Sequence, residues 1–322
     1  MKKGTLKKAV CGIICCALAT LSLAGCKAEE QKPQIVASTY VIADWIGCVL
    51  GEDVQSYSIY VLCDNGEDIH SYEPTVRDIY ALSRCSLFVH AGGGSEEWVE
   101  GTLGSAKNPD MTDLSLMHEL RDLLCETDGQ EHEEKDSHDG HEHEHDEHIW
   151  FSEELVCASI DKISEALGAQ FPERAETYTE NAAAYRERVE GVFADYRECV
   201  RAGARNNILV ADRFPFFYLT SGLGLEYAAA FDGCSAETEA SFEVISRLSG
   251  VIDDTSLGYV IICEGTSDAI ANAVISNTRG GNAVILTLDS MQSVTEKDVS
   301  DGWSYIGAME GNLAVLATAL SK

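Results

Sequence analysis

The sequence predicts an α/β protein in which one long helix joins two halves. From Gln34 onward, short apolar runs alternate with amphipathic stretches, which is the pattern of α/β domains. Between Pro172 and Gly203 the only helix-breaking residue is Gly191, so one helix can span this segment. The chain has 322 residues, 45% apolar and 24% charged. This composition allows a sizeable core in one large or two modest domains and excludes a wholly disordered chain.

The apolar runs and amphipathic stretches supply the expected strands and helices. In the first half, residues 35–171, we expect strands at 35–39, 54–62 and 87–91 and helices near 41–50, 75–83 and 95–103. In the second half, residues 204–322, we expect strands at 208–211, 225–231, 259–263 and 283–288 and helices near 239–251, 268–277 and 304–320. No sequence repeat is visible at a fixed period.

The segment 172–203 is expected to form the helix that joins the halves. Pro172 suits the first turn of a helix. Apolar side chains then recur at three- and four-residue steps, which places them on one helix face: Tyr178, Ala182, Tyr185, Val189, Val192, Tyr196 and Val200. About 30 residues at 1.5 Å each span roughly 45 Å, enough to cross from one half to the other. A coiled-coil dimer is the alternative, but the stripe lasts only about three heptads and small residues interrupt it.

The first 25 residues are typical of a bacterial export signal. A lysine-rich start ends at Lys8, and residues 9–25 carry no charge, a run short of the roughly 20 residues that span a membrane. The ending Leu-Ala-Gly-Cys at 23–26 resembles the lipobox of bacterial lipoproteins. The resemblance implies a signal peptide over 1–25, a lipid on Cys26, a tether over 26–34 and a location on the extracytoplasmic face of the bacterial cell membrane. An uncleaved single-pass anchor is the alternative.

Acidic residues greatly outnumber basic ones. The chain has 23 Lys and Arg against 54 Asp and Glu, for a formal net charge of −31. A surface this acidic repels phosphate backbones, so we expect no nucleic-acid partner. It is compatible with cations as ligands.

Eight cysteines follow Cys26, and the sequence leaves their pairing open. Outside the cytoplasm an even number permits disulfides. No CxxC spacing is present, which argues against a thiolate zinc cluster. We therefore assign no pairs among Cys48, Cys63, Cys85, Cys125, Cys157, Cys199, Cys234 and Cys263.

Six of the nine histidines fall within a low-complexity segment, residues 126–148. The segment also holds eleven acidic residues, one basic residue and no apolar residue, which favours a mobile loop over a core element. Neutral imidazole binds Zn, Cu and Ni well, so we expect a weak auxiliary metal collector built from His132, His138, His141, His143 and His145. Residues 141–145 formally match the zinc-peptidase motif H-E-x-x-H, but no apolar face would hold them in a helix, so a peptidase is not favoured.

Two histidines and two aspartates stand where apolar runs begin or end. His70 follows the strand expected at 54–62, and His148 lies where the loop rejoins an apolar segment. Asp212 ends the run Ile-Leu-Val-Ala, and Asp289 ends the run Val-Ile-Leu-Thr-Leu. Carboxylates at the carboxyl ends of parallel strands point into the crevice in which α/β proteins bind ligands. Together with the two histidines they would form a cation site.

With these residues in view, nearly all of the mature chain resembles the zinc and manganese solute-binding lipoproteins of ABC transporters. The matching motifs are His-Ser-Tyr-Glu-Pro at 70–74, Gly-Gly-Gly-Ser-Glu-Glu-Trp at 92–98, His-Ile-Trp-Phe at 148–151, Ala-Asp-Arg-Phe-Pro-Phe at 211–216 and Glu-Thr-Glu-Ala-Ser at 237–241. A His-rich loop before the second ligand is typical of the zinc-handling branch. The resemblance implies two Rossmann-like α/β lobes joined by one long rigid helix, with the metal site in the inter-lobe cleft.

The resemblance also implies a ligand set, namely His70, His148, Asp212 and Asp289. The third ligand is a His in many zinc binders and a Glu in manganese binders, so Asp212 departs from the zinc pattern and leaves Mn²⁺ as the alternative. Imidazole with carboxylate suits both ions, and intrinsic affinity ranks Zn above Mn. The His-rich loop favours Zn²⁺ as the transported ligand.

The function implied by the resemblance is capture of Zn²⁺ outside the cytoplasm and delivery to an ABC permease and its ATPase subunit, by a monomer anchored through its lipid. An enzyme is the rival class, but no phosphate-binding loop is present, and residues 92–94 are better interpreted as a turn than as a dinucleotide fingerprint. Residues 265–269 depart from the nucleophile elbow at their last position. A closed site of four ligands also leaves no open position for a substrate. A surface adhesin is the other alternative, because some members of the family have been described as adhesins.

Overall fold

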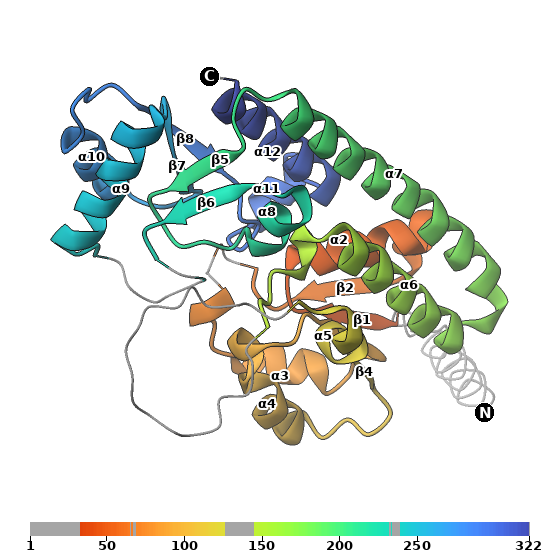
Figure 1. Ribbon diagram of the computed structural model, residues 1–322. Helices are drawn as coiled ribbons and strands as arrows, with labels where there is room; N and C mark the ends of the chain where they lie inside the picture. Colours follow the sequence, from red (N-terminus) through yellow and green to blue (C-terminus); the bar gives the residue numbers. More distant parts are fainter. Residues whose placement is uncertain are drawn as a thin grey trace, which may run out of the picture. The chain divides into compact units, whose positions relative to one another are not determined.

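The computed structural model describes residues 33–64, 66, 69–125, 145–231, 233 and 239–321. From Gln34 onward the chain forms one compact unit with two four-stranded parallel sheets. We call the sheet of β1–β4 with its helices the N-terminal lobe, and the sheet of β5–β8 with its helices the C-terminal lobe (Figure 1). The predicted α/β fold class is confirmed. The predicted signal segment 1–25, the lipid site and four of the loop histidines lie outside the described residues: Cys26, His132, His138, His141 and His143.

The N-terminal sheet has the strand order β2-β1-β3-β4 with every neighbouring pair parallel. Its strands are β1 (Gln34–Ala37), β2 (Ser58–Val61), β3 (Leu87–His90) and β4 (Thr112–Ser115). The first three match predicted strands, and β1 begins one residue before its predicted range. β4 was not predicted, because its sequence Thr-Asp-Leu-Ser contains a single apolar residue and the strand lies at the sheet edge, where little of it needs to be buried.

The helices of the described N-terminal lobe are α2 (Tyr40–Leu50), α3 (Val76–Leu82), α4 (Trp98–Ala106), α5 (Leu116–Glu119) and α6 (Glu153–Gln170), with short 3₁₀ turns at η1 (Gly51–Ser56), η2 (Ile69–Ser71), η3 (Gly94–Glu96), η4 (Arg121–Leu123), η5 (Ile149–Phe151) and η6 (Pro172–Arg174). The helices expected near 41–50, 75–83 and 95–103 are confirmed as α2, α3 and α4. α6 was not predicted, although Leu155, Ile163 and Leu167 are buried at helical spacing and the Ser152 hydroxyl caps its first turn.

The C-terminal sheet has the strand order β6-β5-β7-β8, again with every neighbouring pair parallel. Its strands are β5 (Asn207–Val210), β6 (Glu226–Ala229), β7 (Tyr259–Cys263) and β8 (Val284–Leu288). All four match predicted strands. Its helices are α8 (Phe217–Leu223), α9 (Phe242–Thr255), α10 (Ala269–Ser276), α11 (Glu296–Ser300) and α12 (Tyr305–Leu320). The helices expected near 239–251, 268–277 and 304–320 are confirmed as α9, α10 and α12.

The predicted joining helix is α7 (Ala175–Ala202), preceded by η6 with Pro172 at its start. It packs against α2 and α6 and, nearer its carboxyl end, against α12 (Figure 1). Asn181 donates to the carbonyl of Val49 in α2 (2.9 Å), and the Tyr196 hydroxyl donates to the carbonyl of Met309 in α12 (2.8 Å). The predicted stripe is buried from Tyr178 to Tyr196. The helix is therefore bonded to both lobes.

No helix in the described part of the chain is long and apolar enough to cross a membrane.

In both sheets the loops that leave the carboxyl ends of the strands carry the residues that the sequence singles out. η2, with His70, follows β2, and Asp212 and Asp289 follow β5 and β8. This arrangement is the reason to look for the functional site at these ends.

Candidate metal site

Two of the four predicted ligands lie side by side. The rings of His70 and His148 have centroids 5.7 Å apart and planes inclined by 48°. His148 is buried, with 2% of its surface exposed, whereas the His70 side chain keeps 20%. His70 comes from η2, and His148 immediately precedes η5. The pair is thus built from segments far apart in the sequence, at a place that solvent reaches from the His70 side.

Two consecutive residues, Asp146 and Glu147, each hold one of the imidazoles through a carboxylate. Asp146 Oδ1 lies 2.8 Å from His148 Nδ1 and also accepts the His148 backbone N–H at 2.8 Å. Glu147 Oε1 lies 3.2 Å from His70 Nδ1. An ionised carboxylate can only accept, so both Nδ1 atoms carry hydrogen, and in a neutral ring the lone pair is then on Nε2. Carboxylates behind ligating histidines are the usual means of orienting the ring toward a metal.

The glycine-rich motif at 92–98 fixes Glu147. Gly92 and Gly93 both have positive φ, 85° and 100°, so the predicted turn is confirmed. A Cβ on Gly93 would lie 2.9 Å from the Cβ of Glu147, so only glycine allows this approach. The turn presents Ser95, whose backbone N–H donates to Glu147 Oε2 at 2.9 Å and whose hydroxyl contacts both Glu147 and His70 Nδ1. The motif therefore positions the first histidine instead of binding a nucleotide.

Another buried histidine, His90, holds this turn through Glu96. His90 Nδ1 lies 2.9 Å from Glu96 Oε2, which also accepts the Gly92 backbone N–H at 2.6 Å. His90 Nε2 lies 3.2 Å from Asp113 Oδ1. Burial lowers the pKa of His90, but hydrogen bonds to Asp113 and Glu96 and their negative charges outweigh it and raise the pKa to about 9. His90 is a fixed cation of the fold, which its place in the sequence did not reveal.

The two predicted aspartate ligands are held by the C-terminal lobe. Asp212 is buried and accepts the backbone N–H groups of Arg213 (2.8 Å) and Cys263 (3.0 Å). Asp289 accepts the N–H of Met291 at 2.8 Å, and Asn312 brackets its backbone with two hydrogen bonds of 2.8 and 2.7 Å. The aspartates follow β5 and β8, which flank β7, so their backbones stand roughly 10 Å apart.

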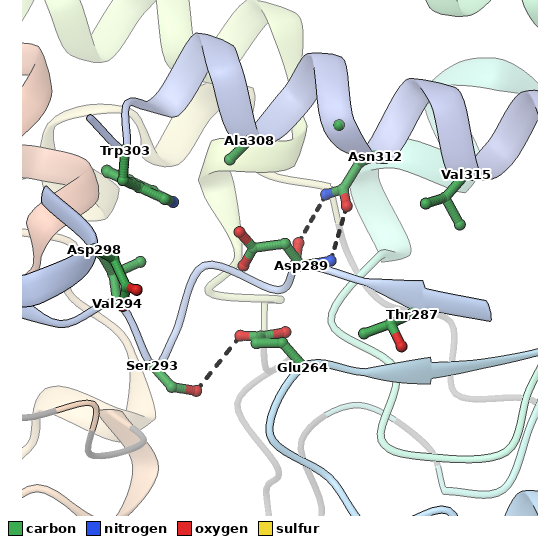
Figure 2. Close-up of a pocket in the computed structure, with 11 residues that line it drawn as sticks. Glu264, Thr287, Asp289, Ser293, Val294, Asp298, Trp303, Ala308, Asn312 and Val315 are labelled. Atoms are coloured by element: carbon green, nitrogen blue, oxygen red, sulfur yellow. Dashed lines mark hydrogen bonds between the residues drawn. The ribbon is translucent and has the colours of Figure 1, made fainter. Parts of the chain in front are cut away.

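Asp289 and Glu264 share a cavity of about 450 Å³ between the end of β8 and α12 (Figure 2). Burial raises the pKa of Asp289, although the Met291 amide favours the ionised form. Burial also raises the pKa of Glu264, and the charge of Asp289 adds to that shift. Glu264 was not singled out from the sequence. In the described part of the chain, no cation is among the groups that shift either pKa, and a bound cation would lower both pKa values.

The structure therefore assembles the histidine half of the predicted site and keeps the aspartates apart from it. Among the described residues no group of three or more His, Cys, Asp and Glu side chains is close enough to hold a metal ion. One contact already joins the two halves, because the side-chain amide of Gln292, three residues after Asp289, contacts His148 Nε2. Of the loop histidines, the described His145 lies apart from the pair, with Nδ1 3.1 Å from the Cys125 carbonyl.

Residues 35–319 match the model of the ZnuA family, described as zinc-uptake complex component A, periplasmic. The chain belongs to this family. A curated relative is the zinc-binding lipoprotein AdcA of Streptococcus pneumoniae, 28% identical over 303 residues. The match covers 94% of this chain but 58% of AdcA, so the chain spans less than two thirds of that relative.

Two solved structures show the same fold. One is the Zn(II)-bound ZnuA-like domain of S. pneumoniae AdcA, with a TM-score of 0.71 and 24% identity over 90% of this chain and all of that domain. The other is the periplasmic zinc-binding protein TroA of Treponema pallidum, with a TM-score of 0.70 and 20% identity over 90% of this chain and all of TroA. The expected two-lobed architecture is confirmed, and the family is one of uptake components and not of enzymes.

The charged His90 makes one prediction for stability. Its pKa rises from about 6.5 in the unfolded chain to about 9 in the fold, so its contribution is complete below pH 6.5 and is lost as pH rises through 9. At 1.36 kcal/mol per pKa unit, the native protein should lose about 3 kcal/mol of unfolding free energy relative to His90→Gln between pH 6 and pH 9.5. Urea unfolding across this range measures the difference. His118→Gln, at an exposed histidine, is the control, and parallel pH curves for His90→Gln and the native protein would contradict the assignment.

Proposed function

We propose that this chain captures Zn²⁺ outside the cytoplasm and delivers it to the permease of an ABC transporter, which works with an ATPase subunit. The observation that carries the proposal is the pair His70 and His148, each with Nδ1 held by a carboxylate so that Nε2 can coordinate. Membership in a zinc-uptake family and the zinc-binding name of AdcA support it. Both also favour transport over the adhesin alternative.

We assign the ion four ligands, His70, His148, Asp212 and Asp289. The last two stand at the carboxyl ends of parallel strands, and Asp289 begins the segment that already reaches His148 through Gln292. Binding would draw this segment and the histidine pair around one ion. Two neutral imidazoles and two carboxylates give a neutral site for a divalent cation. Zn²⁺ is preferred to Mn²⁺ on the intrinsic affinity of imidazole ligands, and Mn²⁺ is the second candidate.

Loss of one histidine tests the site. His70→Ala should lower the affinity of the tight one-to-one Zn²⁺ site by more than about a hundredfold, since removing even an outer-sphere partner of a metal ligand weakens binding 10- to 100-fold. Isothermal titration in competition with a chelator measures this. His118→Ala, which removes an exposed histidine, should leave the tight site intact. Unchanged tight binding in His70→Ala would reject the ligand assignment.

We also propose that the chain is anchored at the extracytoplasmic face of the membrane by a lipid on Cys26, after loss of residues 1–25, and works as a monomer. The name of the S. pneumoniae AdcA relative as a lipoprotein supports the anchor. Cys26→Ser should move the protein out of the membrane fraction or leave it unprocessed, without changing its folded state. Fractionation with mass spectrometry of the N-terminus tests this. A substituted protein that stays in the membrane with residues 1–25 attached would favour a transmembrane anchor.

We propose that the His-rich loop is a weak metal collector. The collector ends before Asp146 and Glu147, because these two carboxylates contact the histidines of the tight site. Deleting residues 131–144 should remove the weak Zn²⁺ equivalents and preserve the single tight one, because 145–148 remain. Extending the deletion to residue 147 removes both orienting carboxylates and should weaken the tight site by about 10- to 100-fold. Equilibrium dialysis counts the equivalents. The weak ones should fade below about pH 6.5, where free histidine becomes protonated. Loss of the tight site in the shorter deletion would mean that the loop supplies a primary ligand.

A further inference from the structure

Gln292 makes a contact that the proposed ligand set does not explain. Its side-chain amide nitrogen meets Nε2 of His148. Both side chains are buried, with 7% and 2% of their surfaces exposed. His148 precedes η5 of the N-terminal lobe, and Gln292 follows β8 of the C-terminal lobe. A single side chain therefore bridges the two lobes on the very atom that would coordinate the ion.

With a neutral His148, hydrogen-bonding chemistry gives the donor. Asp146 can only accept from His148, so Nδ1 of His148 carries the hydrogen and Nε2 has the lone pair. The amide nitrogen of Gln292 can only donate, and it donates to this lone pair. A metal ion bound by Nε2 needs the same lone pair. The hydrogen bond from Gln292 and a bond from His148 to zinc are therefore mutually exclusive.

The segment that carries Gln292 is held in a defined position. The backbone N–H of Ser290 donates to Glu264 (2.6 Å), and Trp150 of the N-terminal lobe donates to the Ser290 carbonyl (3.0 Å). The next residue, Met291, has a φ of 63°, a left-handed conformation that non-glycine residues rarely adopt. Unusual backbone of this kind is found at ligand clamps and switch segments. Gln292 therefore meets His148 because its backbone is directed there.

We propose that Gln292 sets the affinity of the site by occupying His148 Nε2 until the ion displaces it. The inference rests on the proposed function, since it assumes that His148 is a ligand. Displacement requires the same broken hydrogen bond whichever divalent ion enters. Gln292 should therefore lower the affinity for every ion by one factor and leave the ratio of affinities for Zn²⁺ and Mn²⁺ unchanged. The same amide can return to Nε2 when the ion leaves, which favours release.

Replacing the amide by an apolar side chain tests the proposal. In Gln292→Leu the dissociation constants for Zn²⁺ and for Mn²⁺ should both fall about three- to tenfold, the equivalent of one net hydrogen bond, with their ratio preserved. Chelator competition with each metal salt alone, on the whole chain in detergent, measures both constants. Gln55→Leu is the matched control, because it makes the same amide-to-leucine change at an exposed glutamine in η1. It should leave both constants unchanged.

Weaker or unchanged binding in Gln292→Leu would overturn the proposal, and weaker binding with an altered ratio would make Gln292 itself a ligand. His148→Ala separates the two levels of the argument. If that variant keeps the tight site, the proposed ligand set fails whatever Gln292 does. If it loses the site while Gln292→Leu shows no gain, only the inference about Gln292 fails.

A measurement on the native protein covers the case in which Gln292→Leu does not fold. In ¹⁵N spectra of the metal-free protein, His148 should be neutral with its proton on Nδ1. One equivalent of Zn²⁺ should shift Nε2 and release the Gln292 side-chain amide protons from their hydrogen bond. An imidazolium, or a proton on Nε2, in the metal-free state would mean that the amide faces His148 with its oxygen, and the proposal would be wrong.

Discussion

The pairing of two consecutive carboxylates with two imidazoles is the constraint on which the site depends. Asp146 and Glu147 are adjacent in sequence, so their side chains diverge, one toward His148 and one toward His70. Such a short stretch can orient both rings only if the backbone that receives Glu147 is fixed. The turn at Gly92 and Gly93 meets that need, and the His90–Glu96 pair holds the turn. The buried His90–Glu96 pair thus helps to determine, through the turn and Glu147, how the two imidazole rings are oriented.

The C-terminal lobe contributes buried carboxylates to the proposed site, whereas the N-terminal lobe contributes oriented imidazoles. Burial raises the pKa of both Asp289 and Glu264, and no cation of the described residues is among the groups that shift either value. A divalent ion would relieve that unfavourable environment. The ion would therefore find oriented neutral donors on one lobe and uncompensated negative charge on the other. Because α7 is hydrogen-bonded to both lobes through Asn181 and Tyr196, it links the two contributions within one folded unit.

Much of this could be predicted from the sequence, and the exceptions have physical reasons. Seven of the eight described strands were predicted. The central strands β1, β3, β5 and β7 are buried and stand out as apolar runs, and the edge strands β2, β6 and β8 are also mostly apolar. The edge strand β4 was missed because it has one apolar residue. The histidine pair was predicted by motif. Gln292 and Ser95 were not, because a neutral polar residue carries no signal of its own, and its role depends on which distant atom the fold brings to it. Glu264 follows its strand as Asp289 does, so the same signal was present there and was overlooked. His90 ends a strand, but its charge depends on Glu96 and Asp113, whose approach follows from the turn and from the unpredicted β4.

The affinity of such a site is a difference between opposing contributions. Capture is favoured by the desolvated carboxylates, which gain a counter-ion, and by imidazoles whose orientation is already determined, so little conformational entropy is lost on binding. In the proposed site it is opposed by the hydrogen bond on His148 Nε2, which the ion would replace. A protein that only sequestered metal would have no use for that opposing contact, since an apolar side chain at position 292 would not donate to that lone pair. A protein that must pass its ion to a permease needs a metal-free state that is itself satisfied, because release otherwise leaves a buried acceptor without a partner. The amide of Gln292 meets that requirement at the one atom where it matters.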